Sequence, residues 1–315
     1  MKKILITGGT GFLGKNLSYK LKKNYKIFVC SRNLDNGINI RRNLNVEFIP
    51  LNISKYSDVD EVLFNVKPDV VIHAAASKFV DLSEKFVSET VDTNILGSKN
   101  VILCSRKYKC KKFIVISTDK ASPPFTNLYG ISKATMEQIL ISINSDKKQD
   151  LNIVRFGNLA WSTGSVLNQW DEMRKQKKII KTTGPEMTRF FYSINNAVKL
   201  IENLLKNNKR FNNKVIIPEM KSLWIRDMLV EFCTQNKVKW KKIEKRKMDK
   251  PYETLISSNQ KYKKIKFQNN NEKIFIIDLK SNEKSKKNEE INSLNSKKFS
   301  KKEIIDIINK KPKYL

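Results

Sequence analysis

Residues 3–14 have the sequence KILITGGTGFLG, an apolar run followed at once by a glycine-rich turn. The run Lys3 to Thr7 predicts a buried strand, and the amphipathic stretch Lys15 to Lys23 predicts a helix after the turn. Glycines at positions 8, 11 and 14 let the backbone approach a pyrophosphate and direct the N-terminus of that helix towards it. Because a second strand, Lys26 to Cys30, follows the helix, the stretch predicts a Rossmann-type dinucleotide-binding domain.

Strands and helices alternate beyond this unit, which favours an α/β fold with a doubly wound parallel sheet. Further strands are predicted at Val46 to Leu51, Asp69 to Ile72, Lys112 to Ile116 and Leu151 to Phe156, and helices at Ser54 to Phe64 and Thr90 to Lys107. The apolar pattern weakens after Phe156. We therefore expect residues 1–158 to form the nucleotide-binding domain and residues 159–315 to form mainly a smaller C-terminal substrate-binding lobe.

The C-terminal half has its own predicted elements. Ser193 to Lys206 predicts a helix that packs back on the nucleotide-binding domain, and Leu223 to Gln235 predicts another. The polar residues 281–298 are typical of a solvated linker. Ser300 and Glu303 form a capping-box pattern that predicts a terminal helix at about residues 300–309.

The composition limits the classes of partner. Lys and Arg number 62 against 31 Asp and Glu, a formal charge of +31, but no RNA-binding signature is present, so we expect no specific nucleic-acid partner. Four scattered cysteines and one histidine, His73, predict no metal site and no disulfide. The absence of a signal peptide and of any run of about 18 apolar residues predicts a cytoplasmic protein without a membrane span.

Residues at the ends of the predicted strands define a cofactor site. Arg32, after the second strand, favours NADP because an arginine there accommodates a 2′-phosphate; NAD is the alternative. Small residues after the fourth strand leave room for a dinucleotide, whereas the neighbouring His73 is expected to be a structural hydrogen-bonder. The predicted cofactor-binding residues are Gly8, Thr10, Gly11, Phe12, Leu13, Gly14, Ser31, Arg32, Asn52, Ile53, Ala74, Ala75, Ala76, Tyr129 and Lys133.

A second polar stretch, Ser117-Thr118-Asp119-Lys120-Ala121, follows a predicted strand and precedes Tyr129 and Lys133. Open α/β sheets carry their chemistry at the carboxyl ends of strands. Tyr129 and Lys133 are four residues apart on a predicted helix and therefore share one face. A nearby ammonium lowers the pKa of a phenol, which would make Tyr129 a proton acceptor.

With these motifs in place, the chain resembles the extended short-chain dehydrogenases/reductases, and more narrowly the nucleotide-sugar 4,6-dehydratases of polysaccharide biosynthesis that act on UDP-N-acetylglucosamine. The segments that carry the resemblance extend from Thr7 to about residue 255. They include residues 7–14, 31–32, 73–78, 93–97, 117–133, 155–158, 164–166, 187–190 and 246–253. Ser-Thr-Asp-Lys-Ala before Tyr-Gly is the specific element, since the glycine turn marks only the superfamily.

The resemblance implies a dehydration with an internal hydride transfer. Tyr129 would take the C4 hydroxyl proton, Lys120 the C5 proton, and Asp119 would protonate the departing C6 oxygen. Thr118 would bond the C4 oxygen, and Asn94 would order a water and Lys133. Lys120 must spend time neutral, which we expect from burial or from a neighbouring cation such as Lys78. The substrate-binding residues would be Lys78, Asn158, Ser165, Val166, Arg189, Arg246 and Glu253.

We therefore predict an NADP-dependent UDP-sugar 4,6-dehydratase that is a homo-oligomer by family resemblance. One alternative is an epimerase or 4-ketoreductase of the same superfamily, which needs Tyr129 and Lys133 but not the pair Asp119 and Lys120. Another, from a different class, is a non-catalytic NADP-binding sensor or scaffold.

Overall fold

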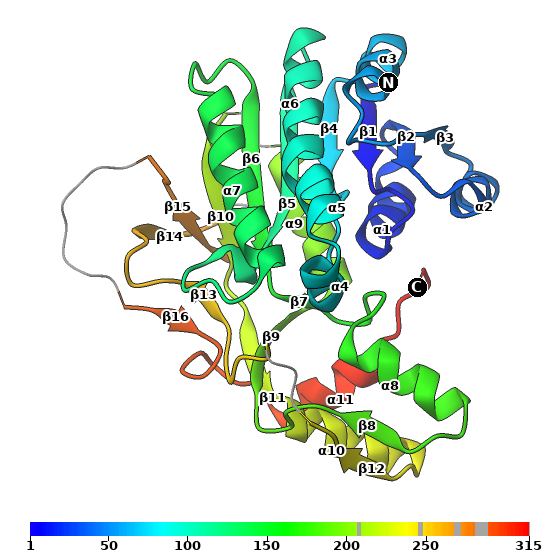
Figure 1. The fold of residues 1–315 in the computed structure, drawn as a ribbon, viewed down its shortest axis with the longest axis vertical. Coiled ribbons are helices and arrows are strands. Elements are labelled where there is room, and N and C mark those ends of the chain that lie inside the picture. The colour runs from blue at the N-terminus through cyan, green and yellow to red at the C-terminus, as the bar shows by residue number, and fades with distance from the viewer. Residues whose placement is uncertain (207–208, 245–247, 268–271, 281–288, 315) are drawn as a thin grey trace.

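A computed structural model describes residues 1–206, 209–244, 248–267, 272–280 and 289–314. In this part of the chain a large twisted sheet lies between layers of helices, and a smaller lobe of short strands and helices hangs from one end of it (Figure 1). The predicted α/β fold of Rossmann type is confirmed.

The central sheet contains nine strands in the described residues, in the order β14-β15-β10-β6-β5-β4-β1-β2-β3. The pairs from β10 to β3 are parallel, whereas β15 pairs antiparallel with both β10 and β14. The bounds are β1 (Lys3–Thr7), β2 (Lys26–Ser31), β3 (Glu47–Pro50), β4 (Val70–His73), β5 (Lys112–Thr118), β6 (Asp150–Phe156), β10 (Lys214–Pro218), β14 (Tyr262–Lys266) and β15 (Lys273–Ile277). The order β3-β2-β1-β4-β5-β6 is that of a dinucleotide-binding sheet.

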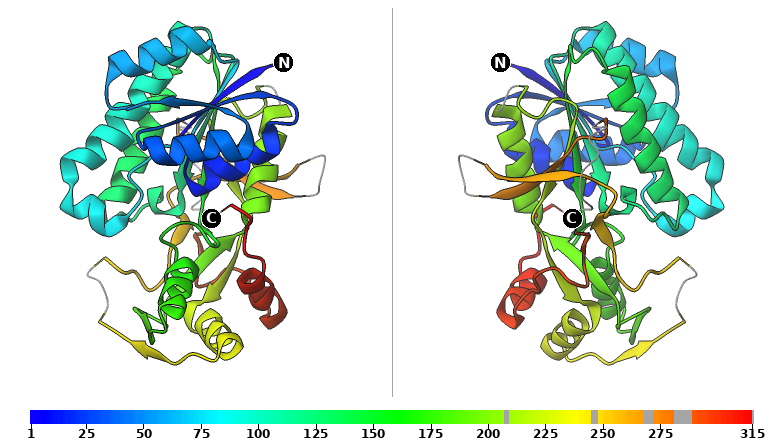
Figure 2. Two further views of the ribbon diagram at one scale, coloured as in Figure 1. Left: turned by 90° about the vertical axis from the view of Figure 1, so that its right-hand side faces the viewer. Right: turned by 90° about the vertical axis from the view of Figure 1, so that its left-hand side faces the viewer.

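Helices cover both faces of this sheet (Figure 2). On one face α1 (Phe12–Leu21) packs against α9 (Ile194–Lys206), as predicted for residues 193–206, while α2 (Leu34–Leu44) packs on β3. On the other, α6 (Ser98–Lys107) lies between α3 (Tyr56–Val66) and α7 (Leu128–Ile143). Apolar residues spaced three and four apart give α9 its buried stripe, which includes Ile194, Ala197, Val198, Ile201 and Leu204.

The predicted helix Thr90 to Lys107 is interrupted. The helical path runs through α5 (Val87–Val91), a π-helical segment, Asp92–Gly97, and then α6. A Cβ at Gly97 would lie 2.8 Å from the Ile53 side chain, so this position packs tightly under the cofactor side of the sheet. Such π segments occur frequently at functional sites, and this one contains Thr93 and Asn94.

The smaller lobe is built from short strands. Its elements are β7 (Asn158–Leu159), β8 (Ile180–Thr182), β9 (Thr188–Tyr192), β11 (Lys221–Trp224), β12 (Trp240–Lys242), α8 (Val166–Lys175) and α10 (Ile225–Asn236). The predicted helix Leu223 to Gln235 thus starts two residues late, because Leu223 and Trp224 pair with β9. The central sheet also takes β10, β14 and β15 from beyond residue 158, and the domain division at that point stays a prediction.

The predicted solvated linker is wrong for residues 289–298. Here β16 (Ile291–Asn292) pairs with β13 (Thr254–Ile256). Ser293 is fully buried, and its hydroxyl donates a hydrogen bond to the backbone of β9. Residues 281–288 lie outside the described part. The terminal helix α11 (Lys301–Asn309) is as predicted, with Ser300 and Glu303 forming the capping box.

Candidate active site

A cleft of about 500 Å³ lies at the carboxyl ends of β1, β2, β4 and β5; we name it the nucleotide cleft. All fifteen predicted cofactor-binding residues line it: Gly8, Thr10, Gly11, Phe12, Leu13, Gly14, Ser31, Arg32, Asn52, Ile53, Ala74, Ala75, Ala76, Tyr129 and Lys133. Parallel strands end at the same edge of a sheet, so segments far apart in the sequence meet there.

The glycine turn fits a dinucleotide sterically. Gly8 has a φ of +65°, and a Cβ there would lie 2.6 Å from the Ala75 nitrogen. A Cβ at Gly14 would lie 2.4 Å from the Cα of Gly9, so α1 packs directly on the turn. Gly11, the N-cap of α1, has no side-chain cap, which leaves the first amides of the helix to face an anion.

His73 lies next to the cleft and joins elements that form it. Its Nδ1 lies 2.7 Å from Thr7 Oγ1 and its Nε2 lies 2.8 Å from Ser98 Oγ, so the imidazole ties β4 to β1 and α6. Burial, and then the nearby Lys133, lower the pKa of His73 to about 3. The ring is neutral and structural, as predicted.

Tyr129 and Lys133 stand on the first turns of α7, whose N-cap Asn127 accepts a hydrogen bond from the Gly130 amide at 2.8 Å. The predicted direction of the phenol's pKa is wrong. The protein atoms packed around the phenol raise the pKa of Tyr129 to about 12, and the groups that oppose this are Lys120 and the Thr118 hydroxyl, not Lys133. Burial also lowers the pKa of the Lys133 ammonium to about 8, against the opposing effect of Glu137.

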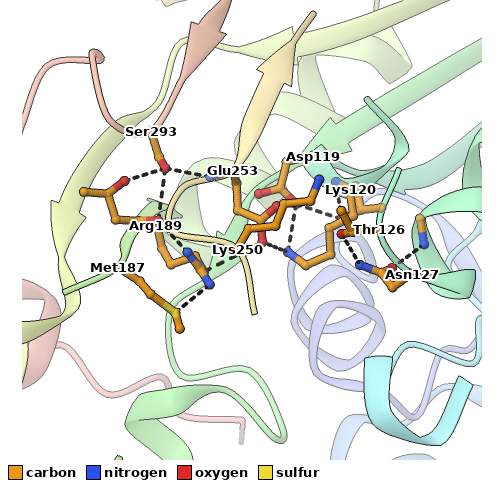
Figure 3. A network of polar contacts seen from close by, with 12 residues as sticks. Asp119, Lys120, Thr126, Asn127, Met187, Arg189, Lys250, Glu253 and Ser293 are labelled. Carbon is orange, nitrogen blue, oxygen red and sulfur yellow. Dashed lines mark hydrogen bonds and ion pairs between the residues drawn. The ribbon is translucent and has the colours of Figure 1, made fainter. Parts of the chain in front are cut away.

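Asp119 and Lys120 form a buried charged network with two residues from the lobe (Figure 3). Lys120 Nζ lies 3.3 Å from Asp119 Oδ1 and 3.2 Å from Glu253 Oε1. Arg189 Nε lies 3.7 Å from the same Glu253 oxygen. The Thr118 hydroxyl donates to Asp119 Oδ1 at 2.9 Å, whereas Asp119 Oδ2 is buried and has no hydrogen-bond partner among the described residues.

The protonation states follow from this arrangement. Burial raises the pKa of Asp119, with Lys120 opposing and Glu253 adding to the rise, so this carboxyl can hold a proton. Burial would lower the pKa of Lys120, but the carboxylates of Asp119 and Glu253 outweigh it and raise that pKa. Burial would raise the pKa of Glu253, but the cations Lys120 and Arg189 lower it. The expectation that burial or Lys78 favours a neutral Lys120 is therefore wrong for this state of the site.

Asn94 and Lys78 both lie in the segment between β4 and α6, and of the two only Lys78 lines the cleft. Asn94 is buried and exchanges hydrogen bonds with the backbone of Ser77, and its amide also donates to Ser132 Oγ at 2.9 Å. It therefore braces α7 beside Lys133. Lys78 lines the cleft, and its ammonium donates to the carbonyl of Thr163, between β7 and α8, at 2.8 Å.

The predicted substrate-binding residues do not all lie at one site. Asn158 and Lys78 line the nucleotide cleft. Ser165 and Val166 start α8 and lie outside its lining, and the Ser165 hydroxyl has no hydrogen-bond partner in the described residues. Arg189 and Glu253 are outside the cleft lining, where Glu253 pairs with both Lys120 and Arg189. Arg246 falls outside the described part of the chain.

Two carboxylates near the site, Glu137 and Glu89, were not predicted from the sequence. Glu137 forms a buried double contact with Arg155, and Glu89 pairs with Arg32 at the cleft. The four-residue spacing of Lys133 and Glu137 on one helix was a usable signal for the first. Nothing local to Glu89 points to Arg32, which is 57 residues away.

The fold and the cleft define an extended short-chain dehydrogenase/reductase. Residues 4–307 match the model of the family described as polysaccharide biosynthesis protein, and the chain belongs to that family.

Curated relatives with several names match most of the chain. It is 35% identical to an uncharacterized membrane protein of Methanocaldococcus jannaschii, over 100% of this chain and 97% of that one. It is 33% identical to a UDP-glucose 4-epimerase of Rickettsia bellii, over 82% and 79%. It is 31% identical to an inverting UDP-N-acetylglucosamine 4,6-dehydratase of Campylobacter jejuni, over 98% and 97%. The last two names support an enzyme of the nucleotide-sugar dehydratase and epimerase group.

The solved structure of Pen from Bacillus thuringiensis is similar over nearly the whole chain, with a TM-score of 0.86 at 29% identity, covering 98% of this chain and 96% of that one. In the described residues no helix is both long enough and apolar enough to cross a membrane.

Proposed function

We propose that the chain is a nucleotide-sugar 4,6-dehydratase that converts UDP-N-acetylglucosamine to a UDP-4-keto-6-deoxy-hexose for surface polysaccharide biosynthesis. The observation that carries the proposal is the pair Asp119 and Lys120 after the end of β5, beside Thr118 and Tyr129, with Asp119 buried and Lys120 mostly buried. The exposed fractions of the two side chains are 1% and 16%, so neither is a surface charge.

A nicotinamide dinucleotide is the cofactor that the nucleotide cleft fits. When bound, it supplies the acceptor that takes a hydride from the sugar and returns it. The turn at Gly8 to Gly14 would hold its pyrophosphate, and Ala74 to Ala76 would leave room for the dinucleotide. The preference for NADP over NAD rests on Arg32 and is part of the proposal.

Each proton transfer in the proposal is assigned to a named side chain. Tyr129, once its phenol is ionised, would take the proton of the C4 hydroxyl, with Thr118 bonding the same oxygen. The resulting ketone acidifies the C5 proton, which Lys120 would accept once it is neutral. Asp119 would give its proton to the departing C6 oxygen, and its raised pKa suits an acid.

The other functions place different demands on the same residues. An epimerase or 4-ketoreductase needs Tyr129 and Lys133 but no buried acid such as Asp119, and a non-catalytic sensor needs none of the three. A cytoplasmic location belongs to the same proposal, supported by four cysteines that are all free thiols.

The test is to incubate the protein with NADP or NAD and UDP-N-acetylglucosamine and to record the 4-keto product. The variant Asp119→Asn should lose water elimination by about 10²–10⁴-fold while still reducing cofactor in single turnover, because C4 oxidation does not use this acid. Asp146→Asn, which alters a carboxylate paired with Arg106 away from the cleft, is the matched control.

Undiminished turnover in Asp119→Asn would show that the reaction is not a dehydration. An absence of product with several UDP- and dTDP-sugars would favour the sensor or scaffold.

A further inference from the structure

Arg32 is the residue on which the choice between NADP and NAD depends. It follows β2, lines the nucleotide cleft, and lies where Rossmann domains recognise the adenosine ribose. Many such domains place an acidic residue here, which bonds the 2′-hydroxyl of NAD. In this chain the cleft-lining residues at this point are Ser31, Arg32 and Asn33, and none carries a carboxylate.

The fold brings a carboxylate to this point from another element. Glu89, on α5, accepts a hydrogen bond from Arg32 Nη1, and the contact is also an ion pair. Arg32 and the neighbouring Thr93 hydroxyl, which donates to Glu89 Oε1 at 3.1 Å, lower the pKa of Glu89. Arg32 and Thr93 both line the cleft, so Glu89 is bonded to two of its lining residues.

The ion pair with Glu89 reduces the number of hydrogen-bond donors that Arg32 has free for a 2′-phosphate. A free guanidinium presents several donors to a 2′-phosphate, but here Glu89 occupies part of that set and brings a negative charge beside the remainder. A 2′-phosphate must compete with Glu89 for Arg32, whereas the 2′-hydroxyl of NAD carries no charge to repel. Side-chain exposures of 58% for Arg32 and 46% for Glu89 mean that solvent and salt moderate the effect.

We propose that Glu89 is a specificity-determining residue that, by engaging Arg32, lowers the preference of this protein for NADP over NAD. The inference rests on the proposed function only in that a nicotinamide dinucleotide binds the cleft. It requires no turnover and no particular sugar.

The experiment measures the Kd of NAD and of NADP by calorimetry for the wild type, Glu89→Gln, Arg32→Ala and the double variant, at one low salt concentration. Glu89→Gln should tighten NADP by about fivefold relative to NAD, because an exposed ion pair contributes up to about 1 kcal/mol. The gain should vanish on the Arg32→Ala background. Asp60→Asn, which removes a half-buried carboxylate paired with Lys107 outside the cleft lining, controls for the general change in charge.

The outcomes separate the two proposals. If both cofactors bind and Glu89→Gln leaves their ratio unchanged, or if the gain survives in the double variant, this inference is wrong and the proposed function stands. If neither cofactor binds the wild type, both are wrong.

Discussion

The carboxylates around Lys120 favour its charged form, whereas its predicted role as a base needs the neutral form. A lysine that accepts a proton must be neutral, yet Asp119 and Glu253 raise its pKa, while Arg189 opposes them. Lys250 and Tyr129 also interact electrostatically with the Lys120 ammonium. Glu253 is fixed in place, because its own amide donates to Ser293 Oγ at 2.9 Å. We therefore propose that Glu253 sets the charge of Lys120.

Replacing Glu253 by Gln should lower the pKa of Lys120, because one of its two carboxylate neighbours is lost. If neutral Lys120 is the base, kcat rises with pH, and the rising limb of the profile should move to lower pH in the variant. The measurement is the pH dependence of 4-keto product formation. Glu290→Gln, which alters a carboxylate bonded to Asn292 instead, should leave the limb in place. A limb that does not move in Glu253→Gln would refute the assignment.

His73 should not become charged until the protein is strongly acidified. Its folded pKa of about 3 lies below the ordinary value of 6.5, so the unfolded chain binds more protons between these values. The stability that His73 contributes is complete above pH 6.5 and is lost as the pH falls towards 3, a loss on the order of 4–5 kcal/mol. His73 is the one histidine of the sequence, so a single imidazole signal in an NMR titration reports it. A midpoint near the ordinary value would contradict the structure.

At the scale of elements, α7 is joined to the central sheet by a buried ion pair. Arg155 on β6 donates to both oxygens of Glu137, at 2.9 and 2.6 Å, and the Ser117 hydroxyl of β5 donates to Glu137 as well. Both charged side chains are 1% exposed. The pair thus fixes the helix that carries Tyr129 and Lys133 to the strands that end at Thr118 and Phe156.

Arg155→Met should lower the free energy of unfolding by about 3–5 kcal/mol, because it leaves the Glu137 carboxylate buried without its cation. Chemical denaturation measures this loss. The double variant Arg155→Met with Glu137→Gln should recover part of it, and Lys310→Met, which breaks an exposed pair with Asp306, should cost less than about 1 kcal/mol. Equal losses in the buried and the exposed variant would show that the pair has no special structural role.

At the scale of the whole molecule, the formal charge of +31 opposes compaction. Salt screens repulsion between exposed charges with a Debye length of about 10 Å at about 0.1 M. The thermal midpoint should therefore rise between roughly 20 mM and roughly 300 mM NaCl, as differential scanning calorimetry would show. A midpoint that falls would mean that surface ion pairs outweigh the repulsion.

The sequence by itself determined the features that depend on local patterns. Hydrophobic periodicity and the glycine turn predict the parallel sheet and its cofactor side, helical spacing places Tyr129 and Lys133 together, and the Ser300 cap predicts α11. Each follows from neighbours within a few residues, so no tertiary knowledge was needed.

Only the tertiary structure decided the charge balance of the site. Glu253 forms an ion pair with Lys120, and Glu89 forms one with Arg32. Ser293 lies in a stretch that the sequence predicts to be a linker, yet it is buried and bonded to Glu253. Folding sets these distances and burials between remote segments. Since a pKa depends on both, the direction found for Tyr129 is opposite to the one that its spacing from Lys133 indicates. The direction found for Lys120 is opposite to the one expected from burial or from Lys78.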